Sequence, residues 1–380
     1  MRDLRGLLLA PLLLPLFDIS GCLPPRRKSR QFSDSFARML LFRLLNQRFV
    51  DFLYLASNAY LCQAFLYLIN FNRLCATDVQ TSSERKLERA LRAAAMADKT
   101  VIITTLNEAW AASGSIFDLF LESFRTGEKT SRLLNHLLVL ALDNQAYRRC
   151  LQVHTQCLAL HTEGSNFNQE TFFNTPGYLE IVWRRIDFLR LVLQMGYNFV
   201  FSDADVMWLR DPFRHFDPYA DIHMACDHFW GSSVNSSSVI NSGFMFVRAN
   251  NRSIEFYEYW YASRERYPGL HDQGVLNVIR FKAVTLGLKV HLLDTAYFGG
   301  LCEPSKNLNL VCTMHATCCF GMNAKIHELK AMLKDWRYFI SFAPRWRRSY
   351  AFSWSVPQKC SLAAIANQVN STKHTDHNMK

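Results

Sequence analysis

The sequence of 380 residues has no internal repeat and no low-complexity segment of note. It also lacks the paired C-x2-C spacing of structural zinc modules, and the adjacent cysteines Cys318 and Cys319 would be an unusual pair of zinc ligands. Hydrophobic residues make up 49% of the chain and charged residues 20%, which argues against wholesale disorder. The length permits one large domain with accessory segments, or two smaller domains.

The cysteines that are present suggest disulfides. The chain has 11, of which eight follow residue 76: Cys150, Cys157, Cys226, Cys302, Cys312, Cys318, Cys319 and Cys360. An even number is compatible with pairing in an oxidising lumen, and we favour this over free buried thiols and over zinc. Three glycosylation sequons, at Asn235, Asn251 and Asn370, matter only if the chain enters the secretory pathway.

The formal net charge of +11 would be typical of a nucleic-acid-binding protein if it were spread over a domain. It is not spread in this way. Residues 1–76 hold ten Lys/Arg against four Asp/Glu, so the remaining 304 residues carry only +5. A basic excess beside apolar segments is the pattern of membrane topology signals, and we expect no nucleic-acid partner.

Two apolar stretches lie in this N-terminal region. Residues 7–17 are too few to span a bilayer, whereas residues 49–71 are long enough but include Asp51, Asn58, Gln63 and Asn70. Seven basic residues between Arg26 and Arg48 precede the second stretch, so the positive-inside rule predicts a type II anchor with the large domain in the Golgi lumen. The alternative is a helix that packs on the domain surface.

From Lys99 onward, strand-like and helix-like segments alternate, which predicts an α/β domain with a parallel sheet flanked by helices. We expect strands at 101–106, 137–142 and 198–202, and helices at 144–153 and 179–195, the last ended by Gly196. Ser113 is the expected cap of a helix that contains Ile116 to Phe124. The predicted organisation is an N-terminal region at 1–76, the main domain at 77–357 and a loose polar tail at 358–380.

The stretch 198–212, NFVFSDADVMWLRDP, carries the chemistry. An apolar strand delivers Asp203 and Asp205 to the carboxyl edge of the sheet, where ligands bind in such folds. Side chains at i and i+2 of a strand point the same way, so both carboxylates could face one Mn²⁺ or Mg²⁺ ion. A strand-end cap or turn is the alternative, because D-x-D triplets are common.

The chain resembles the plant nucleotide-diphospho-sugar transferases that include cell-wall arabinosyl- and xylosyltransferases. The resemblance covers roughly residues 84–340. The shared segments are DKTVIITTLNEAWA (98–111), WRRIDFLR (183–190), GYNFVFSDADVMWLRDPF (196–213), ACDHF (225–229), NSGFMFVRANNRSIEFYEYWY (241–261), HDQGVLN (271–277), YFGGLCEPSKNLNLVCTMHATCCFG (297–321) and DWR (335–337). It implies a GT-A fold, a single Rossmann-like domain with a mostly parallel mixed sheet, and transfer that retains the anomeric configuration.

The resemblance also implies a metal and diphosphate site. Asp203 would lie near the donor ribose and the metal, Asp205 would be a direct ligand, and His315 would be the third protein ligand. Without the resemblance, a single histidine near two cysteines is more often structural. Gly321 and Lys325 are similar to the diphosphate-binding residues of retaining galactosyltransferases, although a solvated helix lysine is an equal alternative.

A sugar pocket is implied by DQ and LN at 272–277, with Asp272 accepting hydrogen bonds from sugar hydroxyls and Gln273 beneath the anomeric carbon. Asn241 would contact the sugar, and Ser242 stands where many relatives have Gly. The other expected donor-binding residues are Arg185, which could instead form a surface salt bridge, and Thr104, Thr105 and Asn107, which could instead cap the first strand.

Together these features predict a retaining, metal-dependent enzyme that transfers a sugar, by resemblance a pentose, from a UDP-sugar to a cell-wall polysaccharide or glycoprotein. The acceptor hydroxyl would be assisted by the leaving phosphate on the same face of the sugar, rather than by an enzymic nucleophile. One alternative is a catalytically silent sugar-binding or scaffold protein on the same fold. Another is a metal-dependent phosphoester hydrolase, which would need more ligands near Asp203 and Asp205 than the sequence offers.

Overall fold

The computed structural model describes residues 84–160 and 175–361. The chain divides between Lys86 and Leu87 into two units, and the second unit contains every strand that is described. The predicted anchor at 49–71, the sequon at Asn370 and most of the predicted tail lie outside the described residues. Among the helices that are described, none has both the length and the apolar character needed to cross a bilayer.

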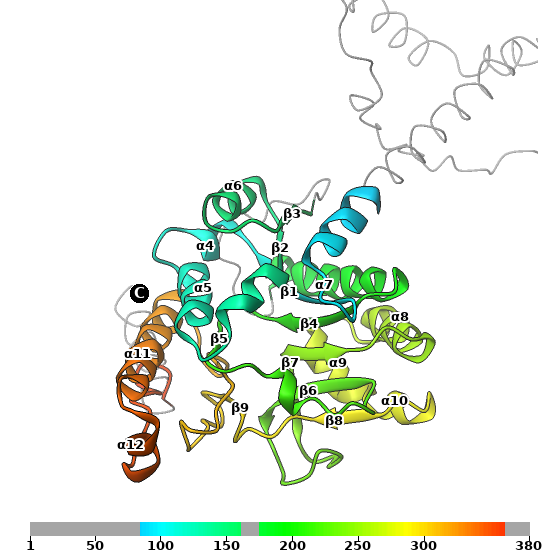
Figure 1. Cartoon of the computed structure of the whole chain (residues 1–380). Coiled ribbons are helices and arrows are strands. Elements are labelled where there is room, and N and C mark those ends of the chain that lie inside the picture. Colours follow the sequence, from blue (N-terminus) through cyan, green and yellow to red (C-terminus); the bar gives the residue numbers. More distant parts are fainter. Residues whose placement is uncertain (1–83, 161–174, 362–380) are drawn as a thin grey trace, which may run out of the picture. The chain divides into compact units, whose positions relative to one another are not determined.

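A seven-stranded sheet in the order β3-β2-β1-β4-β7-β6-β8 forms the centre of the domain (Figure 1). Its strands are β1 (Thr100–Leu106), β2 (Leu137–Ala141), β3 (Cys157–Ala159), β4 (Asn198–Ser202), β6 (Ile222–His228), β7 (Val239–Val247) and β8 (Val290–Leu292). Strand β7 is antiparallel to both of its neighbours, and all the other pairings are parallel. The carboxyl ends of β1 and β4 therefore meet the amino end of β7 at one edge.

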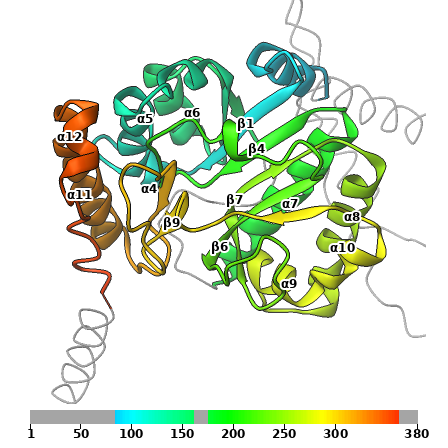
Figure 2. The same cartoon turned by 60° about the horizontal axis from the view of Figure 1, so that its bottom comes forward.

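The strands are nearly continuous apolar runs because helices cover both faces of the sheet. Along β1, Ile102 belongs to one hydrophobic core, whereas Val101 and Ile103 belong to the other. The helices on the first face are α4 (Glu108–Ala111), α5 (Ile116–Thr126), α6 (Asn144–Val153) and α11 (Met322–Ser341), and those on the second are α7 (Pro176–Gln194), α8 (Asn251–Arg266), α9 (Asp272–Ile279) and α10 (Phe281–Thr285) (Figure 2). A short helix, α12 (Pro344–Ser349), follows α11.

A smaller sheet in the order β5-β10-β9 lies beside the first. It consists of β5 (Val206–Trp208), β9 (Phe298–Gly300) and β10 (Thr313–His315), with β10 antiparallel to β5 and parallel to β9. Strand β5 follows β4 after only three residues, so the D-x-D motif connects the two sheets. The predicted α/β domain, with a mostly parallel mixed sheet flanked by helices, is confirmed.

Local predictions were close, with one clear error. The strand at 198–202 and the helix at 144–153 have the predicted bounds, and Gly196, with φ +79°, ends α7 as expected. The predicted cap Ser113 is wrong, because the residue before α5 is Ser115. The backbone N–H of Gly114 instead donates to Asp118 at 2.7 Å, which places the helix start two residues later.

Six of the eight cysteines form disulfides, Cys150–Cys157, Cys302–Cys318 and Cys319–Cys360. The predicted pairing is thus confirmed for these six, while Cys226 and Cys312 are free and buried. The start of the predicted tail is fixed as well, because the buried carboxylate of Glu328 in α11 accepts hydrogen bonds from the backbone N–H groups of Gln358 and Cys360.

Candidate active site

The D-x-D motif is fixed through its backbone. The N–H of Asp203 donates to the carbonyl of Gly243 in β7 at 2.7 Å, and the carbonyl of Asp205 accepts from the N–H of Ala316 at 3.0 Å. A turn between the two sheets, closed by a bond of 3.2 Å from the N–H of Val206 to the carbonyl of Asp203, thereby holds both carboxylates at the edge where β4 ends.

Strand pairing brings His315 to the same place. In the antiparallel pair of β10 and β5, His315 lies opposite Val206, next to Asp205. Its Nε2 is 3.1 Å from Oδ1 of Asp205 and 3.9 Å from Oδ2 of Asp203. One ligand atom from each of the three residues lies within 4.8 Å of the others. Two carboxylates and one imidazole suit a divalent cation that prefers oxygen ligands, so the residues present fit a metal ion.

Gly243 makes this convergence possible, and sequence reasoning gave it no role. A Cβ atom at this position would lie 2.5 Å from Oδ2 of Asp203 and 2.5 Å from Cε1 of His315. Real Cβ atoms do not approach other atoms so closely, so a larger residue would displace at least one of the two side chains. The glycine in the NSG segment at 241–243 was the available signal.

Two cations neutralise the carboxylates. Lys325, near the start of α11, places Nζ 2.5 Å from Oδ2 of Asp205 and donates a second hydrogen bond to the carbonyl of Ala316 at 3.1 Å. Arg185, in the middle of α7, donates from Nη1 to Oδ1 of Asp203 at 2.9 Å and from Nη2 to Oδ2 of Asp272. The guanidinium thus connects the predicted metal site to the predicted sugar pocket, and the alternative of a surface salt bridge for Arg185 is excluded.

The two acids of the motif differ electrostatically. Burial would raise the pKa of the Asp205 carboxyl, but Lys325 and His315 hold it well below its ordinary value. Burial raises the pKa of Asp203, against the lowering effect of Arg185, and the charge of Asp205 raises it further. Burial lowers the pKa of His315, but the neighbouring Asp205 outweighs this effect and raises it. Asp205 is therefore the more firmly ionised of the two carboxylates.

Asp272 begins α9 and is 1% exposed. Burial would raise its pKa, but Arg185 and then His271 lower it to about 2, so the carboxylate is ionised at neutral pH. The backbone carbonyl of Asp272 accepts a hydrogen bond of 3.0 Å from the indole of Trp260 in α8. Contacts from α7 and α8 therefore fix both the charge and the position of this residue.

Asp227 joins the remaining predicted sugar-binding residues. It lies in the shared segment 225–229, but the sequence indicated no role for it. It accepts hydrogen bonds from Nδ2 of Asn241 at 2.9 Å, Nε2 of Gln273 at 2.9 Å and the hydroxyl of Thr317 at 2.8 Å. The Gln273 amide also accepts from the N–H of Ser242 at 3.2 Å, so both ends of this amide are held. The place of Asp227 near the end of strand β6 was the only available signal.

These side chains surround one cavity of about 440 Å³. Of the predicted site residues, those that line it are Thr105, Asn107, Arg185, Asp203, Asp205, Asn241, Asp272, Gln273, His315, Gly321 and Lys325. Thr104 is fully buried and is not among the lining residues. The side chain of Asn107 accepts a hydrogen bond from the N–H of Trp110, so this residue also caps α4. Tyr178 and Trp110 line the cavity too, and neither was predicted to.

Comparison with known proteins identifies the family of the chain. The family model of the nucleotide-diphospho-sugar transferases matches residues 132–329. Two uncharacterized proteins of Arabidopsis thaliana are 45% and 37% identical to the chain; the first match covers 73% of this chain and 74% of that protein, and the second covers 78% and 90%. A UDP-D-xylose:L-fucose alpha-1,3-D-xylosyltransferase of Arabidopsis thaliana is 27% identical over 29% of this chain and 32% of its own length.

The matched range includes the D-x-D motif, the Asp272-Gln273 pair, His315 and Lys325, which are the residues that the fold brings together. The chain belongs to the nucleotide-diphospho-sugar transferase family and is a glycosyltransferase.

Proposed function

We propose that the chain is a metal-dependent, retaining glycosyltransferase that moves a pentose from a UDP-sugar to a cell-wall glycan or glycoprotein. The observation that carries the proposal is the convergence of Asp203, Asp205 and His315 within 4.8 Å, at a cavity of about 440 Å³. A pentose donor is supported by the names of the xylosyltransferase relatives.

One side of the cavity suits a diphosphate. Mn²⁺ or Mg²⁺ held by Asp203, Asp205 and His315 would neutralise negative charge on the leaving diphosphate. Lys325 is on the first turn of α11, where the helix dipole also favours an anion. Its ammonium group donates to Asp205 and to the carbonyl of Ala316 in this structure, and its third N–H can turn toward a phosphate oxygen. The lysine and the amino end of the helix thus bind and orient the nucleotide.

Another part of the cavity, around Asp272 and Gln273, suits the sugar. Asp272 is ionised and paired with Arg185, so it accepts hydrogen bonds from sugar hydroxyls rather than attacking carbon. The Gln273 amide is a weak nucleophile, and its two hydrogen bonds hold it in place. With both groups engaged, the favoured route is the one in which the leaving phosphate assists the acceptor hydroxyl on the same face of the sugar.

A Golgi location with the enzyme domain in the lumen is part of the same proposal. It rests on the basic and apolar N-terminal sequence, which lies outside the described residues. The three disulfides support it, because such bonds persist in oxidising compartments.

Donor hydrolysis tests the proposal without any assumption about the acceptor. The purified full-length chain is incubated with a set of UDP-sugars, with and without Mn²⁺, and released UDP is measured. We expect release from a UDP-pentose only with the metal, and NMR of the freed sugar should show the anomeric configuration of the donor. Asp205→Asn should abolish release.

Asp187→Asn is the matched control, because Asp187 pairs with Arg190 on the surface of the helix that carries Arg185. This variant should keep full activity. If neither the wild-type chain nor the control releases UDP from any donor while both bind UDP, the protein is a silent sugar-nucleotide-binding protein and the proposed activity is wrong. Equal release with and without metal would refute metal dependence alone.

A further inference from the structure

A second cavity, of about 450 Å³, lies at the edge of the large sheet where β8 is the last strand. Its lining comes mainly from residues 217–220, 233–236, 280–284 and 288–292, and none of its described lining residues also lines the donor cavity. The proposed metal, diphosphate and sugar contacts all lie at the donor cavity, so the second cavity has no part in them.

The second cavity is apolar inside and along much of its rim. The buried apolar residues that line it are Ile240, Ala283, Leu288 and Leu292. Four further apolar side chains of the lining are between 59% and 79% exposed, namely Tyr219, Val234, Phe281 and Val284. Several exposed apolar side chains gathered around one hollow mark a place where another group binds.

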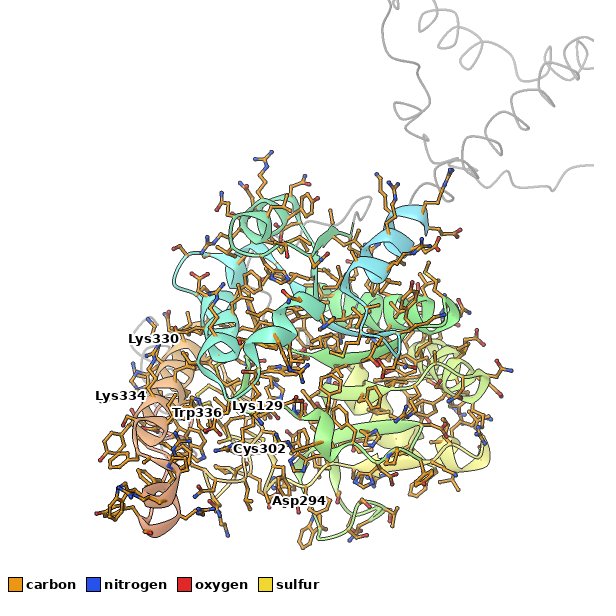
Figure 3. The ribbon with its side chains drawn as sticks, viewed as in Figure 1. Lys129, Asp294, Cys302, Lys330, Lys334 and Trp336 are labelled. Carbon is orange, nitrogen blue, oxygen red and sulfur yellow. A yellow bond between two sulfur atoms is a disulfide. The ribbon has the colours of Figure 1, made fainter. Side chains whose placement is uncertain are left out.

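One glycosylation sequon lies in the wall of the second cavity. Asn235 and Ser236 line it, and Ser237 completes the Asn-Ser-Ser sequon. The three residues belong to the loop 229–238, which connects β6 to β7. Figure 3 shows this loop at the lower edge of the domain, well away from α11. The sequon is therefore on the surface and beside a hollow.

Hydrogen bonds fix the loop on both sides of the sequon. The carbonyl of Ser233 accepts from the N–H of Leu292 in β8 at 2.8 Å. The carbonyl of Ser238 accepts from Nη1 of Arg280 at 2.8 Å. The loop thus holds the sequon at a constant position relative to the cavity.

The side chain of Asn235 has room for a substituent. Its Oδ1 accepts from the N–H of Ser237 at 2.8 Å, and its Nδ2 donates to the carbonyl of Trp230 at 2.9 Å. The Nδ2 atom has two hydrogens, and this contact needs only one of them. A sugar can therefore replace the other while the turn of the loop is kept.

The sequon at Asn251 provides a comparison elsewhere on the domain. Asn251 is the first residue of α8, is exposed and does not line the second cavity. The hydroxyl of Ser253, which completes this sequon, is buried and forms the capping box with Asn250. Replacing Asn251 removes a sequon without changing the second cavity.

An N-acetylglucosamine residue suits the lining of the second cavity. The C–H face of a sugar and the methyl of its acetamido group are apolar and can pack on the rings of Tyr219 and Phe281. The sugar hydroxyls can meet the polar side chains of the rim, which include Ser236, Lys289 and His291.

Attachment to the rim favours this occupant over a membrane or a protein partner. A sugar bound to Asn235 is tethered within reach of the cavity, so its effective concentration is high and weak contacts are sufficient. A bilayer takes up apolar side chains that protrude, whereas these surround a hollow whose lining includes Asp217 and Lys289.

We propose that Asn235 carries an N-linked oligosaccharide whose first N-acetylglucosamine residues cover the second cavity. In the transfer, Nδ2 of Asn235 loses a proton and bonds to C1 of the first sugar. The bond from C1 to the diphosphate of a lipid-linked oligosaccharide breaks, and the lipid diphosphate leaves. The chain is the acceptor in this reaction, and the cell's oligosaccharide transferase is the catalyst. The inference rests on the lumenal location in the proposed function.

Mass spectrometry of the full-length chain purified from plant cells tests the modification. The peptide that contains Asn235 is measured before and after a peptide N-glycosidase in heavy-oxygen water, which labels each released site. We expect a glycan on Asn235, its loss in Asn235→Gln and in Ser237→Ala, and its retention in Ser237→Thr, which keeps the sequon. An unmodified Asn235 overturns the proposal.

A tag with its own sequon, added after Lys380, separates the possible reasons for failure. If the tag is glycosylated and Asn235 is not, the glycan at Asn235 is refuted and the lumenal location stands. If neither is glycosylated, the lumenal location is wrong, and the glycan with it. Hydrolysis of UDP-sugars should be equal in the wild-type chain and in Asn235→Gln, so the transferase activity is tested separately.

Hydroxyl-radical footprinting tests whether the glycan covers the second cavity. Tyr219 and Phe281 should be oxidised several-fold faster in Asn235→Gln than in the glycosylated chain, because their rings become exposed. Tyr338, which is 62% exposed on α11, should react equally in both and serves as the internal reference. Asn251→Gln, the matched control, should leave the protection of Tyr219 and Phe281 unchanged. Equal oxidation of these two rings with and without the glycan at Asn235 would show that it does not occupy the cavity.

Discussion

Gly243 leaves the space in which the Asp203 carboxylate lies, because a Cβ at position 243 would be 2.5 Å from Oδ2 of that residue. The same atom would meet the ring of His315 at 2.5 Å. Gly243→Ala should therefore displace at least one predicted metal ligand. We expect metal-dependent hydrolysis of the donor to fall more than tenfold, and the apparent affinity for Mn²⁺ measured from that activity to fall with it.

Gly274→Ala is the matched control, because a Cβ there would make only ordinary contacts of 3.6 Å with His271. It lies in α9, where alanine is a better helix former than glycine. This control should keep its activity. Circular dichroism should show both variants folded, and an active Gly243→Ala enzyme would contradict the importance of this close approach.

The ion pair of Asp272 with Arg185 predicts a stability that depends on pH. The pKa of Asp272 is lowered to about 2 in the folded protein, against an ordinary value of 3.8. The pair stabilises the fold fully above the ordinary value, and this contribution is lost as pH falls toward 2. The shift corresponds to about 2 kcal/mol, of which roughly half is lost at pH 3.

Urea unfolding of the wild-type chain and of Asp272→Asn between pH 7 and pH 3 measures this contribution. The difference in free energy of unfolding should be largest near neutral pH and should shrink by about 1 kcal/mol at pH 3. Asp187→Asn, which removes a partly exposed ion pair with Arg190 on the surface of α7, should cost less than about 1 kcal/mol. A difference for Asp272→Asn that is constant over this range would show that Arg185 does not hold the pKa of Asp272 low.

The sequence allowed the sheet and its carboxyl edge to be predicted, because β1, β2 and β4 are short apolar runs of the kind that parallel sheets bury on both faces. Such runs place Asp203 and Asp205 at the ligand-binding edge by topology alone. The meeting of Asp205, His315 and Asp272 depends on strand pairing and helix packing across more than 60 residues of chain. Only resemblance to known transferases made those three predictable.

The sequence did not identify residues whose role depends on a contact made in the folded domain. Asp227 carries no motif of its own, and its role became visible when Asn241, Gln273 and Thr317 were seen to donate to it. The role of Gly243 follows from the close packing of the Asp203 and His315 side chains against it. The cap of α5 was misplaced by two residues because Ser113 and Ser115 are the same residue type, and contacts made in the fold, such as the hydrogen bonds from Gly114 to Asp118 and from Ser115 to the carbonyl of Ala109, distinguish them.

Lys325→Met tests the diphosphate side of the cavity. Charge-assisted hydrogen bonds contribute about 1.5 to 3 kcal/mol, so we expect the affinity for UDP in the presence of Mn²⁺ to fall about tenfold or more. Calorimetric titration with UDP measures this. Lys330→Met, one helical turn and a half further along α11 and exposed, should bind UDP like the wild-type chain. If Lys325→Met bound UDP as tightly as the wild-type chain, this lysine would not bind the diphosphate, and its role would be the contact with Asp205.

Thr104 and Thr105 are neighbours on β1, and their side chains point to opposite faces of the strand. Replacing each by valine should therefore have a different effect. The hydroxyl of Thr104 is buried without a hydrogen-bond partner, and Thr105 lines the donor cavity. Thr104→Val removes an unsatisfied polar group at constant shape, so the free energy of unfolding should stay the same or rise by about 1 kcal/mol, with unchanged affinity for UDP.

Thr105→Val should have the reverse effect. Stability should hardly change, while the affinity for UDP falls by roughly threefold to tenfold, the equivalent of one hydrogen bond of about 1 kcal/mol. Chemical unfolding and calorimetric titration on both variants provide the four values needed. If Thr104→Val weakened UDP binding as much as Thr105→Val does, nucleoside binding would depend on the strand as a whole. The assignment of Thr105 as a specific contact of the nucleoside would then be wrong.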